Sequence, residues 1–197
     1  MSSEGAQSVM KCKLLSAQML ITVLNVLAGN DKSEQVRIDF SDTGITFHVT
    51  DKTKAFQTSS HVAASLFDEY SMEGQTDSVT CNLEPFAKCV SIFGNSKLLT
   101  TTLQMTYSSD EKSIKLILDE NEMHSECLIR TLASIDEIID YGPLFSEEDT
   151  MMGAIVKPTA LRCALTDIEN MKSASDVEFA FHPEGGLCVS CSDPYLV

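Results

Sequence analysis

The sequence predicts an α+β fold in which antiparallel strands carry two helices on one face of a sheet. Apolar and polar residues alternate over much of the first 132 residues, which is typical of half-buried strands. Two stretches, 17–28 and 84–93, instead show helical periodicity. The pattern of 36–51 then recurs at 177–193, an offset of 141 residues (177 − 36). This repeat predicts a second copy of the same unit.

Composition limits the class of protein. The chain has 197 residues and is 43% hydrophobic, enough for one or two domains with a core. Its formal net charge of −15 argues against non-specific nucleic-acid binding by the chain as a whole. Seven cysteines scattered through apolar patterns indicate buried free thiols of a reducing compartment. Because no window could span a membrane, we expect a soluble intracellular protein with no membrane partner.

The first domain is expected over residues 10–132, after a flexible tail at 1–9. Ser16 is a suitable N-cap for the first helix, which Gly29 would end. Pro85 suits the first turn of the second helix, and Gly94 would close it after Phe93. Strands are expected at 10–15, on either side of a turn at 42–44, and at 54–62, 101–107, 113–118 and 124–132, with a loop from 63 to 77.

An acidic interdomain linker is expected at 133–152, where Gly142-Pro143 interrupts any regular element. The remaining residues, 153–197, would be the N-terminal part of a second domain. They predict a strand at 153–158, a helix at 159–170 and the hairpin at 177–193. By the repeat, a complete second domain would run to about residue 270, so we expect this one to be partial, with an uncovered apolar sheet face.

Both predicted helices of the first domain carry a polar stripe with the same spacing. Residues 18, 22, 25 and 29 form one stripe, and residues 84, 88, 91 and 95 form the other. The opposite faces are apolar, with Phe86, Val90 and Phe93 on the second helix. Each helix therefore has a core face and a face toward water.

Residues 67–96, FDEYSMEGQTDSVTCNLEPFAKCVSIFGNS, carry a family resemblance. The run "SVT-x-NL" leading into "CVSIFG" is similar to the Rad-one family, a subunit of the heterotrimeric nine-one-one DNA-damage checkpoint clamp. The order of elements over residues 10–197 resembles PCNA-like sliding clamps more broadly. The resemblance implies a PCNA-like sliding clamp fold with its first domain complete and its second partial.

The resemblance also implies a function. Two other clamp subunits would complete a heterotrimeric ring around double-stranded DNA in the nucleus. A clamp loader would place it at damage, and checkpoint and repair proteins would bind it. The helices' polar stripes would line the inner wall, and the matching DNA-facing positions are Gln18, Thr22, Asn25, Lys88, Ser91 and Arg162.

Few of these positions are basic. PCNA-like clamps carry lysines and arginines on the inner wall, but this chain has only Lys88 and Arg162 at the matching positions, and Ile21 where a lysine would be expected. Contact with DNA would therefore depend on the partner subunits or on nearby lysines, namely Lys11, Lys13, Lys97 and Lys157. Taken without the resemblance, Lys88 and Arg162 are ordinary solvated residues.

Two protein-binding surfaces are expected. The closing strand of the first domain, 124–132, would pair edge to edge with a neighbouring subunit through a strand bearing His124, Glu126, Leu128 and Arg130. The acidic linker would border a groove for partner peptides, with apolar anchors at Ile135, Ile138, Leu144 and Phe145.

We expect no catalytic residue, metal or cofactor, and hence a non-enzymatic clamp subunit. The main alternative is a metal-dependent 3′–5′ exonuclease using Asp119, Glu120 and Glu122, although acids in a turn are usually solvated. A third possibility is an acidic adaptor that does not encircle DNA. Cys188 and Cys191 should point to opposite faces of a strand, and His48 and His124 should face solvent.

Overall fold

The computed structural model describes residues 9–28, 35–50, 56–132, 152–171, 176–182 and 185–192. The chain divides into two compact units, Met1–Ile138 and Ile139–Val197. Apart from Val9 and Met152, the expected tail and linker lie outside the described residues, as do all four expected groove anchors. No described helix is long and apolar enough to cross a membrane.

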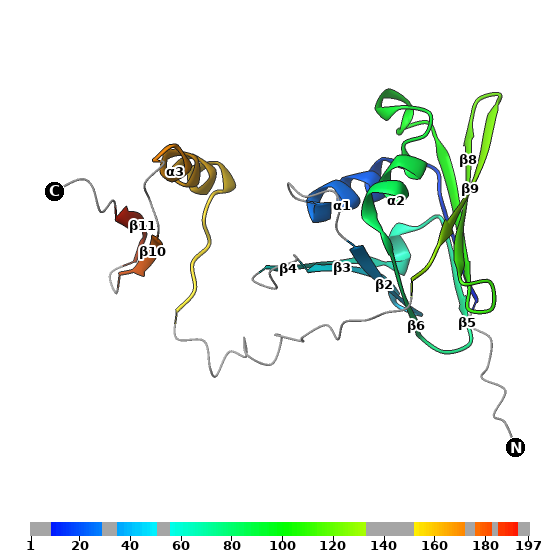
Figure 1. The fold of residues 1–197 in the computed structure, drawn as a ribbon, viewed down its shortest axis with the longest axis horizontal. Coiled ribbons are helices and arrows are strands. Elements are labelled where there is room, and N and C mark those ends of the chain that lie inside the picture. Colours follow the sequence, from blue (N-terminus) through cyan, green and yellow to red (C-terminus); the bar gives the residue numbers. More distant parts are fainter. Residues whose placement is uncertain are drawn as a thin grey trace, which may run out of the picture. The chain divides into compact units, whose positions relative to one another are not determined.

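The described part of the first unit contains two antiparallel sheets (Figure 1). The order in the five-stranded sheet is β5-β1-β7-β8-β9, and in the four-stranded sheet it is β4-β3-β2-β6. An isolated bridge between Thr80 and Leu132 connects them. The strands are β1 Val9–Leu14, β2 Gln35–Ser41, β3 Gly44–Thr50, β4 Gln57–Ala63, β5 Glu69–Glu73, β6 Asp77–Asn82, β7 Thr102–Ser108, β8 Ser113–Glu120 and β9 Met123–Arg130.

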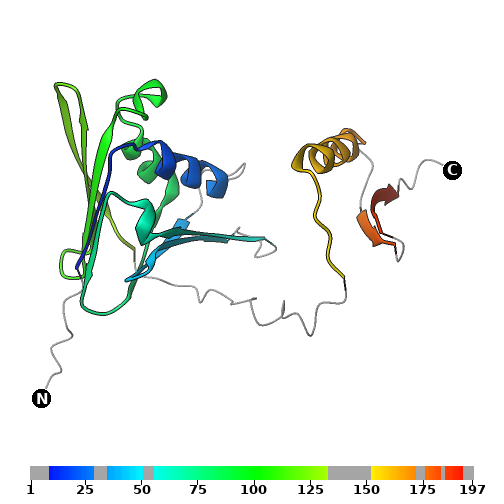
Figure 2. The ribbon, with the colours of Figure 1, turned by 180° about the vertical axis from the view of Figure 1, so that it is seen from behind.

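Two α-helices lie in the angle between these sheets, as Figures 1 and 2 both show. Helix α1, Gln18–Ala28, contacts β3 and β4, whereas α2, Leu83–Val90, contacts β6, β8 and β9. The described part of the unit also contains two 3₁₀ turns, η1 Ala64–Leu66 and η2 Asn95–Lys97. Helix α2 ends three residues earlier than expected, and Gly94 with φ 94° follows the intervening turn.

Strand alternation accounts for the core between helices and sheets. On β2, Val36, Ile38 and Phe40 are at most 1% exposed, and the intervening residues point away from the helices. Phe47 of β3 meets Phe86 of α2, with ring centroids 6.5 Å apart. The inward faces of both sheets thus bury one continuous apolar cluster under the two helices.

The second unit is described through α3, Pro158–Asn170, and the hairpin of β10, Asp176–Phe181, and β11, Leu187–Ser192. The expected strand at 153–158 is wrong, because residues 152–157 form no strand. In the first unit the equivalent strand, β1, is hydrogen-bonded by β5 and β7. No described strand of the second unit pairs with residues 152–157. The backbone of these residues therefore lacks the inter-strand hydrogen bonds that β1 makes in the first unit.

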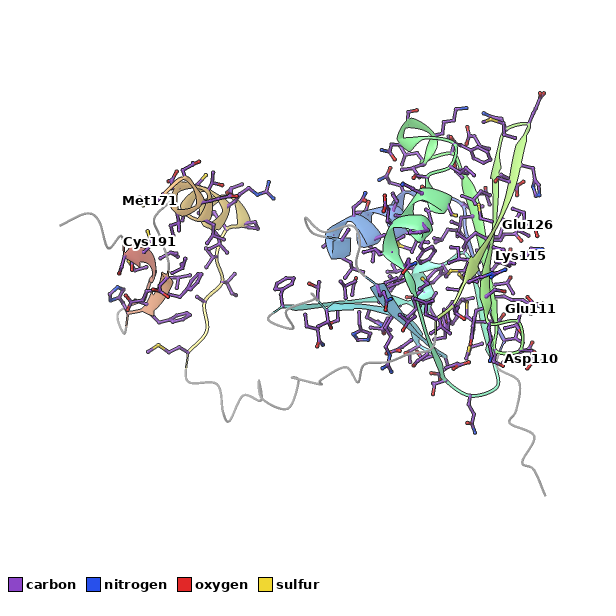
Figure 3. All side chains as sticks on the ribbon, in the orientation of Figure 1. Asp110, Glu111, Lys115, Glu126, Met171 and Cys191 are labelled. Atoms are coloured by element: carbon purple, nitrogen blue, oxygen red, sulfur yellow. The ribbon has the colours of Figure 1, made fainter. Side chains whose placement is uncertain are left out.

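The described hairpin of the second unit is apolar but exposed. Val177, Phe179 and Phe181 are 41–48% exposed, whereas their counterparts on β2 are buried. No residue of α3 is buried, and Leu165, expected to point inward, is 40% exposed. Figure 3 shows Met171 and Cys191 together between α3 and β11, where the two sulfur atoms are 3.5 Å apart.

Candidate functional site

The polar stripes of α1 and α2 meet at a groove between the helices. This cavity of about 180 Å³ is lined by Ile21, Asn25, Ala28, Leu83, Glu84, Ala87, Lys88, Ser91 and Asn95. Three of the six expected DNA-facing residues, Asn25, Lys88 and Ser91, therefore lie together. The apolar faces of both helices hold them there, because residues such as Leu24 and Phe86 are fully buried.

The other three expected DNA-facing residues do not line the groove. Gln18 and Thr22 lie on preceding turns of α1, and Arg162 is exposed on α3 of the second unit. Ile21, expected to replace a lysine on the wet face, is 4% exposed and forms part of the groove wall. An isoleucine is favoured there because the position packs between the helices.

Lys88 is held by an acidic side chain of its own helix. Its Nζ atom lies 2.7 Å from Oε1 of Glu84, and the two side chains are 75% and 43% exposed. The sequence spacing of four, with the acid first, is the favourable order for such a pair on a helix. Helical spacing places residues 84 and 88 on one polar stripe, but it does not show that their charged groups are in contact.

The hydroxyl groups of the stripes bond to their own helices. Thr22 Oγ1 donates to the carbonyl oxygen of Gln18 at 2.7 Å, and Ser91 Oγ donates to that of Ala87 at 2.9 Å. Gln18 Nε2 in turn donates to Thr22 Oγ1 at 3.2 Å. These residues make the helix face polar without adding charge to it.

The nearby lysines are not arranged around the groove. Lys11 and Lys13 alternate with the buried residues of β1, so they lie on the sheet face away from the helices. Lys13 pairs there with Glu69, at 3.1 Å. Lys97 lies beyond α2 in η2, with Nζ 4.0 Å from the sulfur of Met123, and Lys157 precedes α3 in the second unit.

Strand β9 lies at one edge of the five-stranded sheet, as expected for a closing strand. His124, Glu126, Leu128 and Arg130 are all exposed, and Leu128 is 62% exposed. Two of them already pair with β8: Lys115 Nζ lies 2.9 Å from Glu126, and Asp119 lies 2.6 Å from His124 Nδ1. Figure 3 shows Lys115 and Glu126 on the side of the sheet away from the helices.

The three acids of the exonuclease alternative do not converge. Asp119 and Glu120 are consecutive on β8 and point to opposite faces, and Glu120 is 3% exposed. Asn121 Nδ2 donates to Glu120 at 2.9 Å, while Asp119 is engaged by His124. Within the described residues, no group of three His, Cys, Asp or Glu side chains could hold a metal ion.

Residues 9–196 match the family model described as repair protein Rad1/Rec1/Rad17. The chain belongs to this family. Human cell cycle checkpoint protein RAD1 is 25% identical over 121 residues, which cover 60% of this chain and 42% of the human protein. The mouse protein of the same name is 26% identical over 121 residues. The match thus spans less than half the length of these relatives.

A solved structure shows which fold the chain has. The PCNA2-PCNA3 complex from Sulfolobus tokodaii contains a chain that matches with a TM-score of 0.58 and 15% identity. The match covers 92% of this chain and 72% of that one. This Rad1-family chain therefore has the PCNA-like sliding clamp fold, with antiparallel sheets and helices as the sequence predicted.

Cysteines and histidines of this Rad1-family chain depart partly from expectation. All seven cysteines are free thiols, and burial raises the pKa of Cys12 and Cys81 to about 12. Cys163 and Cys188 are exposed, so not every thiol is buried as expected. His48 does not face solvent: its side chain is 16% exposed, with Nε2 3.1 Å from Asp39.

Proposed function

We propose that this chain is a non-enzymatic subunit of a heterotrimeric DNA-damage checkpoint clamp. Two other clamp subunits complete a ring around duplex DNA, a clamp loader places it at damage sites, and checkpoint and repair proteins bind to it in the nucleus. The observation that carries the proposal is a clamp-fold unit whose five-stranded sheet ends at the exposed strand β9.

An edge strand presents backbone N–H and C=O groups that favour pairing with another chain. On β9 these groups are accompanied by Leu128, an exposed apolar side chain, and by charged Glu126 and Arg130. A neighbouring strand added here would extend the antiparallel sheet and cover Leu128. This supports the assembly of the ring through β9.

The helix face supports a weak, sequence-independent contact with DNA. Its side chains are polar, and the residues of α1 and α2 carry no net charge, because α1 has no charged residue and α2 has Glu84 and Lys88. We therefore expect negligible DNA binding by the isolated chain, whose net charge is −15. The partner subunits would supply most of the positive charge within the ring.

A groove along the linker, with anchors Ile135, Ile138, Leu144 and Phe145, remains a prediction for the docking of partner peptides. It lies outside the described residues. The exonuclease alternative is not proposed, because Asp119 and Glu120 point to opposite faces of β8.

Assembly through β9 is tested by co-purification of the tagged chain with its clamp subunits from cells. Leu128→Asp should lose one of the two subunits and keep the other. Leu66→Asp is a matched control, because Leu66 in η1 is 58% exposed and Leu128 is 62% exposed. Recovery of both subunits by Leu128→Asp, at the wild-type ratio, would contradict the proposal.

Encirclement is tested separately on the purified complex. A ring should be retained on closed circular duplex DNA and released when the DNA is cut once, because the ring then slides off an end. A complex that assembles but is never retained on closed circles would favour an adaptor that does not encircle DNA.

A further inference from the structure

We infer that Glu84 sets the strength of the clamp's contact with DNA by holding and neutralising Lys88. This inference rests on the proposed function. Helix α1, QMLITVLNVLA, contains no charged residue, and α2, LEPFAKCV, contains Glu84 and Lys88. The residues that form the two helices thus contribute one cation and one anion to the face expected to meet DNA.

The geometry of α2 stabilises this pair. Glu84 is in the first turn, where the helix dipole favours a negative charge, and Lys88 is in the last turn, where it favours a positive one. Their charged atoms are 2.7 Å apart. The helix itself therefore favours the paired state of Lys88 before any DNA is present.

The pair lowers the attraction of the face for phosphate in two ways. A phosphate oxygen must compete with the Glu84 carboxylate for the Lys88 ammonium group, so fewer counterions are released from DNA on binding. The Glu84 carboxylate would also repel a phosphate that approaches Lys88, because Glu84 and Lys88 line the same groove. Lys88 is nevertheless 75% exposed, so it can reach a phosphate once it is released.

Glu84→Gln keeps the size of the side chain and removes its charge. In the assembled complex, we expect tighter binding to a short duplex of random sequence, by about 2- to 5-fold at low salt. The slope of log affinity against log salt should steepen by up to about 0.9, the value for one additional phosphate neutralised. Lys88→Gln alone should change affinity little, but in the Glu84→Gln background it should abolish the gain.

The control is Glu69→Gln, which removes the acidic partner of Lys13 on the sheet face away from the helices. It changes net charge by the same amount as Glu84→Gln. An equal gain in DNA affinity from both variants would overturn the inference, because it would reflect overall charge alone.

The remaining outcomes distinguish failure of this inference from failure of the proposed function. If the complex binds DNA and Glu84→Gln leaves affinity and salt slope at the wild-type values, the inference is overturned and the proposed clamp function stands. If the assembled wild-type complex does not bind duplex DNA even at low salt, the proposed function is overturned and the inference with it.

Discussion

The ring of Phe40 in β2 stacks on the ring of Tyr107 in β7, with centroids 4.8 Å apart and planes inclined by 21°. The two residues belong to different sheets, and they are 1% and 4% exposed. Tyr107 also donates a hydrogen bond from its hydroxyl to Asp77 Oδ2 of β6, at 2.8 Å. A single side chain thus joins the five-stranded sheet to two strands of the four-stranded sheet.

Two substitutions at Tyr107 should distinguish the contribution of its ring to stability from the contribution of its hydroxyl group. Tyr107→Phe keeps the stack and loses the bond to Asp77, so we expect a loss of about 1 kcal/mol in the free energy of unfolding. Tyr107→Leu loses both, and we expect about 2–4 kcal/mol. Urea denaturation followed by circular dichroism measures both. Equal losses in the two variants would mean that the stacked ring does not help to join the sheets.

Gly44 is required because the start of β3 lies close to the end of β4. A Cβ atom at this position would lie 2.2 Å from the carbonyl oxygen of Val62, and φ is 143°. Gly44→Ala should therefore cost about 2 kcal/mol or more in stability, because backbone atoms must move. Gly94→Ala is the control, since its φ is 94° but no atom lies within 4 Å of the added Cβ. Comparable losses would show that backbone strain, rather than the contact with Val62, decides the cost.

Alternation of apolar and polar residues predicted most strands of the first unit, because a strand buried on one face has an apolar residue at every second position. The strand β5 was missed and assigned to a loop. It contains only Tyr70 and Met72 as inward-pointing residues, and it lies at the sheet edge with three exposed polar positions. Alternation also does not show which strands belong to which sheet, because that depends on long-range pairing.

The candidate site was partly predictable for the same reason. Helical spacing brought Asn25, Lys88 and Ser91 to one groove, because the period of a helix decides which residues share a face. Spacing did not reveal that Ile21 packs between the helices, which depends on how α1 and α2 approach each other. The expected strand at 153–158 failed because a strand needs a partner, which local alternation does not predict.

Asp39 should make stability depend on pH in the acid range. Its burial opposes ionisation, but hydrogen bonds from His48, Ser78 and Arg37 outweigh this and lower its pKa to about 2. Because the folded pKa lies below the unfolded value of about 3.9, the ionised network stabilises the fold fully above pH ~4. This contribution is lost as the pH falls toward 2.

Asp39→Asn should remove that contribution, which we expect to be about 1–2 kcal/mol for this half-buried group at neutral pH. The free energy of unfolding, measured in urea at several pH values, should then fall less steeply between pH ~4 and ~2. Asp110→Asn in the exposed turn before β8 is the control and should follow the wild-type curve. An Asp39→Asn curve parallel to that of the wild type would show that the network does not stabilise the fold.

No nuclease activity is expected from Asp119, Glu120 and Glu122. Metal-dependent hydrolysis of DNA needs carboxylates that converge on one or two ions. Here Asp119 pairs with His124 on the outer face of the sheet, whereas Glu120 is buried on the other face. Labelled single- and double-stranded DNA, incubated with the purified chain and Mg²⁺ or Mn²⁺, should stay intact. Degradation that disappears in both Asp119→Ala and Glu122→Ala would establish a nuclease, whereas degradation that persists in both would indicate a contaminant.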